Sequence, residues 1–248
     1  SLNSGSQNWP GWRGPNGDGT STETGLPQVW DSVTNVIWKT PVPGVGHSSP
    51  IIWDNHLFTL TAFPDTGEKL LLCYDVITGR QIWQKTVVKS TPEAKHQDNS
   101  LASGTPVTNG KMVFVSFLDG EDVVVAAYDF QGTQHWISRP GTFESPHGYS
   151  CSPILYKDMV IINGNSKGDS FLAALNQNDG KIRWKIPHPN LAHSFSTPLI
   201  REISGKVQMF FGGNKEIASY DPETGKKYWF VNGPSEDFCS TPVYNKKN

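Results

Sequence analysis

The stretch YDPETGKKYW, residues 220–229, carries the pattern that decides the fold of this 248-residue chain. An acidic residue is followed by a short turn containing glycine, and a tryptophan stands four residues after that glycine. The chain contains the pattern four times: Asp75, Gly79, Trp83; Asp129, Gly132, Trp136; Asp179, Gly180, Trp184; and Asp221, Gly225, Trp229. Because two β-rich runs joined by a few residues that include glycine form a hairpin, each copy predicts a hairpin with its tryptophan at a fixed register.

A second sequence motif, which we call the Ser/Thr-Pro mark, precedes each hairpin. It consists of a small residue, then Ser or Thr, then Pro. Its five copies are Ser48-Ser49-Pro50, Gly104-Thr105-Pro106, Cys151-Ser152-Pro153, Ser196-Thr197-Pro198 and Ser240-Thr241-Pro242. Proline cannot donate to a sheet ladder, so it belongs at the start of a strand or on an edge strand. Each unit then has an inner strand after the proline, a second strand, a third strand ending at the acid and an outer strand ending at the tryptophan. The second strands are expected at 57–62, 112–117, 159–163 and 207–212.

Successive prolines of this mark lie 56, 47, 45 and 44 residues apart. Four strands in a unit of this length are typical of a β-propeller blade. A β-sandwich or barrel is the alternative, but neither repeats a turn and a tryptophan at fixed spacing. We therefore expect an all-β propeller of about four complete blades in residues 29–248, with residues 1–28 forming an irregular arm packed on it.

Both ends of the predicted propeller are partial. Residues 29–40 predict a lone outer strand that contains Trp38, and residues 239–248 predict only the beginning of a further blade. These partial strands predict an incomplete ring or a fragment of a propeller of about seven or eight blades. An oligomer formed through unpaired blade edges is the alternative, since an open sheet edge is a template for pairing.

The strings CYDVITGRQIW (73–83) and YDPETGKKYW resemble the docking motif of the quinoprotein-like, or PQQ-like, repeat, which is Ala-x-Asp-x-x-Thr-Gly-x-x-x-Trp. The second and third copies have altered turns, and the resemblance spans residues 36–244. The opening WPGWRGPNGDG (9–19) is also similar to the opening of exported bacterial proteins with this repeat. The resemblance implies a bacterial protein of the periplasm or the extracellular space.

Composition argues against several functions. The formal net charge is −2 and the chain has no basic run, which argues against a nucleic-acid surface. No stretch approaches the ~18 consecutive apolar residues of a membrane span, so no integral membrane segment is predicted. The three cysteines, an odd number, are expected to be buried free thiols that serve as small residues: Cys73, Cys151 and Cys239.

Histidines recur in the loops that lead from each outer strand to the next inner strand, and these loops meet at the mouth of the central channel. The longest of these loops, 85–103, contains His96, Asp98 and Asn99. Long loops on a rigid scaffold commonly carry function, so we expect a ligand-binding site there. Its candidate residues are His47, His96, Asp98, Asn99, His147 and His193. No fixed-spacing ligand pair or catalytic constellation is present, so neither a metal site nor catalytic residues are predicted.

Two functions compete. The first is a non-catalytic binding or scaffold module that recognises a protein partner or a small polar ligand, as does the lipoprotein of this repeat type in the outer-membrane protein assembly machinery. The second is a PQQ-dependent dehydrogenase, for which the resemblance implies a quinone, a calcium ion and a catalytic aspartate. Those enzymes carry an adjacent cysteine pair, which this chain lacks, and only Asp98 and Asn99 approach the calcium ligands. We therefore favour the scaffold and expect no cofactor.

Overall fold

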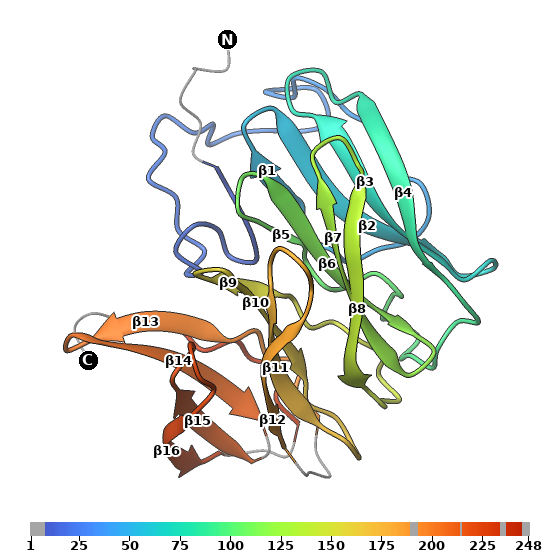
Figure 1. Cartoon of the computed structure of the whole chain (residues 1–248). Coiled ribbons are helices and arrows are strands. Elements are labelled where there is room, and N and C mark those ends of the chain that lie inside the picture. Colours follow the sequence, from blue (N-terminus) through green and yellow to red (C-terminus); the bar gives the residue numbers. More distant parts are fainter. Residues whose placement is uncertain (1–7, 189–192, 214, 234–236, 245–248) are drawn as a thin grey trace.

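The computed structural model describes residues 8–188, 193–213, 215–233 and 237–244. Within this part the chain forms four antiparallel four-stranded sheets and no helix, which confirms the all-β prediction (Figure 1). Each sheet consists of four strands that are consecutive in the chain, with the first strand innermost. The sheets follow one another around an arc, and we call them blades one to four in chain order (Figure 1).

The strands are as follows. Blade one contains β1 (Ile51–Trp53), β2 (His56–Phe63), β3 (Glu68–Asp75) and β4 (Gln81–Lys89). Blade two contains β5 (Val107–Thr108), β6 (Met112–Asp119), β7 (Asp122–Asp129) and β8 (Gln134–Thr142). Blade three contains β9 (Ile154–Tyr156), β10 (Met159–Gly164), β11 (Phe171–Asn176) and β12 (Ile182–Pro187). Blade four contains β13 (Leu199–Ile203), β14 (Lys206–Gly213), β15 (Glu216–Tyr220) and β16 (Lys227–Asn232).

The Ser/Thr-Pro mark proves to be the start of each inner strand. β1, β5, β9 and β13 all begin at the residue after the proline, as predicted. The hydroxyl before the proline has a further role, because it accepts a hydrogen bond from the preceding blade. The backbone N–H of Ser49 donates to Thr105 Oγ1 at 3.3 Å, and that of Thr105 donates to Ser152 Oγ at 2.9 Å. A hydroxyl at this position therefore links the inner strands of blades one, two and three.

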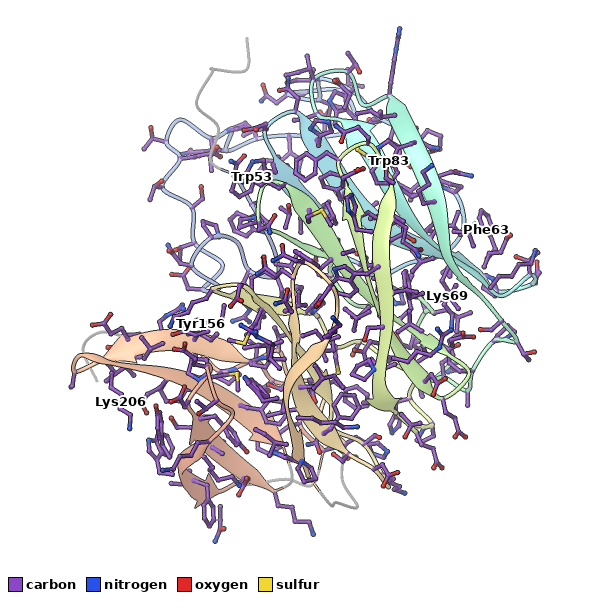
Figure 2. The ribbon with its side chains drawn as sticks, viewed as in Figure 1. Trp53, Phe63, Lys69, Trp83, Tyr156 and Lys206 are labelled. Atoms are coloured by element: carbon purple, nitrogen blue, oxygen red, sulfur yellow. The ribbon has the colours of Figure 1, made fainter. Side chains whose placement is uncertain are left out.

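The repeated tryptophans join neighbouring blades on the outside. Each indole N–H donates to the backbone carbonyl that follows the third strand of the next unit, at 2.8–3.2 Å: Trp38 to Val76, Trp83 to Phe130, Trp136 to Gln177 and Trp184 to Pro222. Each ring also lies against the turn glycine of that unit, as Trp136 does against Gly180. Trp83 accordingly lies where blade one meets blade two (Figure 2). The tryptophan register predicted from sequence is thus the device that docks blades together.

Trp229, in blade four, is the exception among these tryptophans. Its indole N–H donates to Gln208 Oε1 of its own blade at 3.1 Å, and its side chain is 43% exposed. Trp136, by comparison, is 8% exposed. The same sequence motif therefore gives a docked or an undocked tryptophan according to whether a further unit packs against it.

The apolar core lies between the blades. Its largest cluster joins one face of blade one, including Phe58 and Leu71, to the facing side of blade two, including Val115 and Tyr128. A second cluster joins blades two and three, and a third joins blades three and four. Alternation along each strand sends residues to both faces of the sheet, so the second and third strands are apolar on both sides.

Residues 8–17 form an arm that crosses the inner strands. The backbone of Trp9 pairs with Ile52 in β1 at 2.9 Å, and the carbonyl of Pro10 accepts from the N–H of Thr108 in β5 at 2.8 Å. Arg201 in β13 donates to a backbone carbonyl of the same arm. The arm therefore reaches from blade one to blade four along one end of the channel. Residues 1–7 of the expected arm lie outside the described residues.

Two details differ from the sequence predictions. The outer strands run past their tryptophans, for example to Lys89 in β4, so that the loop expected at 85–103 begins at residue 90. Residues 29–40 and 239–244, expected to hold partial strands, contain none. A strand needs a hydrogen-bonded neighbour, and the described residues offer these segments no sheet to join; Trp38 docks all the same. Residues 245–248 of the C-terminal prediction lie outside the described part.

None of the described residues belongs to a helix long and apolar enough to cross a membrane.

Candidate functional site at the channel mouth

A pocket of about 570 Å³ lies at the end of the blades where outer strands lead into the next inner strands. We call it the histidine pocket. Its lining residues are Trp12, His47, His96, Asp98, Asn99, Ser103, His147, Ser150, Ser152, Phe195, Thr197, Asp237, Cys239 and Thr241. Its volume falls within the range of about 300–1,000 Å³ that is typical of ligand pockets. Five of the six residues predicted from sequence therefore line one cavity.

The sixth predicted residue, His193, stands directly behind the wall. Its ring lies edge-on to His147 with centroids 6.3 Å apart, and it stacks on Phe195 at 6.2 Å. His147 in turn faces His96 at 6.2 Å. Three histidines from three successive inter-blade loops therefore meet in a row, as the predicted convergence of the loops requires.

The longest loop, residues 90–106, is held in place at several points. Lys69 is fully buried, and its ammonium group contacts the Glu93 carboxylate and the carbonyl of Leu118 in blade two (Figure 2). At the far end of the loop the carbonyl of Ala102 accepts from the N–H of His47 at 3.0 Å. Because a buried ammonium group is costly unless it is paired, the Lys69 contact fixes the loop across the boundary between blades one and two.

Asn99 acts as a clasp between two loops. Its Nδ2 donates to the carbonyl of His147 at 2.6 Å, and its Oδ1 accepts from Ser103 Oγ at 2.6 Å and from the N–H of Ser100 at 2.8 Å. The amide is therefore engaged on both sides within the protein. Asn99 orients the wall of the pocket, while His96 and Asp98 extend from the same loop with largely exposed side chains.

His193 and Asp237 form a polar pair at the edge of the pocket. The backbone N–H and Nδ1 of His193 contact Asp237 Oδ1 at 2.9 Å and 3.1 Å. These hydrogen bonds, led by the one from the backbone, hold the pKa of Asp237 below its usual value. Asp237 therefore stays ionised through the neutral and mildly acidic range, and it gives this wall a fixed negative charge.

Comparison with known proteins places the chain in a family. A family model described as outer membrane protein assembly factor BamB matches residues 67–237, more than half of the chain. The chain belongs to this family. BamB of Yersinia pestis is 25% identical over 214 residues, which make up 84% of this chain and 51% of that protein. This BamB-family chain thus spans about half the length of the curated relative it matches.

Solved structures show the same fold at low identity. The quinohemoprotein alcohol dehydrogenase of Comamonas testosteroni is 14% identical, with a TM-score of 0.55 over 76% of this chain and 35% of its own. That of Pseudomonas putida HK5 is 14% identical, with a TM-score of 0.59 over 79% of this chain and 35% of its own. These likenesses confirm the predicted propeller of the quinoprotein-like repeat and concern the fold alone.

The pocket of this BamB-family chain does not fit the quinone and calcium of the dehydrogenases. PQQ is a tricarboxylate, and the lining residues include no lysine or arginine to pair with it. Within the described residues, no group of three or more His, Cys, Asp or Glu side chains is placed to hold a metal ion. Asp98 and Asn99, the nearest sequence candidates for calcium, point to an exposed edge and to a neighbouring loop.

Several lining residues were not predicted. Ser152, Thr197 and Thr241 belong to the Ser/Thr-Pro marks, and their convergence at the channel was available from the inner-strand prediction. Trp12 comes from the arm, and no sequence pattern places it here. Cys239 corrects a prediction, because Cys73 and Cys151 are buried free thiols as expected, whereas Cys239 is exposed in the pocket.

Proposed function

We propose that this chain is a non-catalytic scaffold that recognises a protein partner at its loop face, with the histidine pocket at the centre of the contact. Membership of a family described as an outer membrane protein assembly factor supports a role in that assembly. The observation that carries the proposal is the convergence of the three inter-blade loops, with the segments before blade one and after blade four, around one pocket that is not suited to the dehydrogenase cofactors.

The rigidity of this face supports recognition of a partner. The loops are fixed by the Asn99 clasp and the buried Lys69, so the pocket is largely formed before anything binds. A preformed surface loses little conformational entropy on binding, which favours affinity. In this proposal His47, His96, Asp98, His147 and His193 contact or support the bound partner, and Asn99 keeps their loops in register.

The proposed location is the periplasm, on a protein that faces the outer membrane. The family description and the exported type of opening at residues 9–19 support it. Partners in this location are themselves envelope proteins, so the assay should use the envelope of the source bacterium.

Site-specific photo-crosslinking tests the proposal. A photoreactive amino acid is placed at His96 on the loop face, and in a matched variant at Lys157, in the turn between β9 and β10 at the other end of blade three. We expect crosslinks to outer-membrane assembly proteins from position 96 and not from position 157. Equal crosslinking from both ends, or products that contain no envelope assembly protein, would refute the proposal.

A further inference from the structure

The carboxylate side chains that line the histidine pocket have no lysine or arginine beside them in the described lining. Two carboxylates line the pocket, from Asp98 and Asp237, and no lysine or arginine does so in the part of the chain that the structure describes. Lys95 lies in the same loop, but its Nζ donates to the backbone carbonyl of His96 at 3.3 Å and does not line the pocket. The two carboxylates therefore give the described part of the wall its negative charge.

The pocket wall also presents hydrogen-bond acceptors. The carboxylates accept only, and the serine and threonine hydroxyls of the inner strands offer oxygen lone pairs to the cavity. Behind the wall, Nδ1 of His193 contacts Asp237 Oδ1. Its Nε2 is buried and has no hydrogen-bond partner among the described residues. The wall therefore offers acceptors to a cation, including two carboxylates that can only accept.

Two aromatic rings complete the wall. The indole of Trp12 is 36% exposed, and the ring of Phe195 lies beside His147 with centroids 6.2 Å apart. Aromatic faces attract organic cations, and arginine and lysine are the usual partners. Carboxylates, acceptors and aromatic rings in one cavity are the chemistry that recognises an organic cation.

We propose that the histidine pocket binds the guanidinium or ammonium group of an arginine or lysine presented by a partner protein. This inference rests on the proposed function and names the chemistry of its contact. A bare metal ion fits less well, because the described side chains do not converge as three ligands. The volume of about 570 Å³ exceeds what one cationic group fills, which leaves room for residues of the partner next to the basic one.

Short capped peptides with one variable residue test the proposal by titration calorimetry on the whole chain. The central residue is arginine, citrulline or glutamate; citrulline keeps the shape of arginine and removes its charge. We expect the arginine peptide to bind at least tenfold more tightly than the citrulline peptide, and the glutamate peptide to bind more weakly still. Equal binding of arginine and citrulline peptides, or no binding of any peptide, would overturn the proposal.

Matched variants locate the binding. Asp237→Asn and Asp98→Asn should each weaken binding of the arginine peptide several-fold, and Asp98, on an exposed loop, carries little risk to folding. Asp158→Asn, which breaks the ion pair with Arg183 at the opposite end of blade three, is the control and should leave affinity unchanged. Unchanged affinity in both pocket variants contradicts the proposal. Free arginine that binds as tightly as the peptide contradicts a partner segment.

Different results would refute the proposed function and this inference. Crosslinking from position 96 to assembly proteins, together with equal affinity for arginine and citrulline peptides, would support the scaffold role and refute recognition of a basic residue. Absence of the crosslinks would refute the contact with a partner at this face.

Discussion

The docking of tryptophans onto the next blade makes a quantitative prediction about stability, because the chain contains both docked and undocked copies of one motif. In Trp136→Phe the aromatic ring is kept and the indole N–H is lost. The carbonyl of Gln177 then loses a donor at 2.8 Å at a buried blade boundary. Losing one partner of a buried hydrogen bond costs about 1–3 kcal/mol, and the smaller ring leaves a cavity that costs about 1 kcal/mol more.

Trp229→Phe is the matched control. Trp229 is 43% exposed, and its N–H bonds to the side chain of Gln208, which can turn to water instead. Surface substitutions of this kind usually change stability by about 0.5 kcal/mol or less. We therefore expect Trp136→Phe to lower the free energy of unfolding by about 2–4 kcal/mol, and Trp229→Phe to change it by about 0.5 kcal/mol or less.

The assay is thermal and urea unfolding of both variants beside wild type, followed by circular dichroism. A change of 1 kcal/mol shifts the Tm by about 2–4 °C in a domain of this size, so Trp136→Phe should shift it by about 4–16 °C and Trp229→Phe by less than about 2 °C. Equal shifts in the two variants would show that indole docking does not hold the blades together. A larger shift in Trp229→Phe would refute the assignment of the docked and undocked copies.

Three further predictions concern other parts of the fold. Gly180 has φ +69° and a Cβ there would lie 2.5 Å from Trp136, whereas Gly168 has φ +81° and open space around it; Gly180→Ala should therefore cost clearly more than the ~1 kcal/mol of backbone strain expected for Gly168→Ala, measured by urea unfolding. Thr105→Val should cost about 1–3 kcal/mol because the N–H of Ser49 loses its acceptor, while Thr105→Ser, which keeps a hydroxyl, should retain most of the stability. Burial lowers the pKa of His188 from 6.5 to about 4. As the pH falls below 6.5, the unfolded chain therefore takes up a proton at this residue before the folded chain does. The contribution of neutral, buried His188 to stability is complete above pH 6.5 and falls by up to about 3 kcal/mol as the pH approaches 4. His188→Leu should flatten the pH dependence of unfolding in that window, and an unchanged slope would contradict the assignment.

The periodic features of the sequence predicted most of the fold because each has a local physical cause. A proline is confined to the start of a strand or to an edge strand, a turn glycine supplies positive φ, and a tryptophan at fixed register meets the same neighbour wherever a further unit follows. Gly79, Gly132, Gly180 and Gly225 all have positive φ in the structure, as the hairpins require. The strand predicted in residues 29–40 is not formed. Strand formation depends on a hydrogen-bonding neighbour elsewhere in the chain, which the local pattern does not reveal.

The candidate site was predictable only to the level of its loops. His47, His96 and His147 reach one cavity because equivalent loops in a radial fold converge. The roles within the cavity depend on contacts that spacing does not encode, such as the clasp of Asn99 on the carbonyl of His147 and the pairing of Asp237 with His193. Trp12 reaches the pocket through the path of an irregular arm, which has no periodic signal.

The most direct test of partner recognition at the loop face uses the native thiol of Cys239, which lies exposed in the pocket while Cys73 and Cys151 are buried and act as internal controls. The rate at which N-ethylmaleimide modifies Cys239 is measured by mass spectrometry for the purified chain, alone and after addition of the assembly proteins that crosslink to position 96. The scaffold account predicts that modification of Cys239 slows at least several-fold when those proteins bind. Binding that leaves the rate unchanged would place the partner on another face and contradict the account.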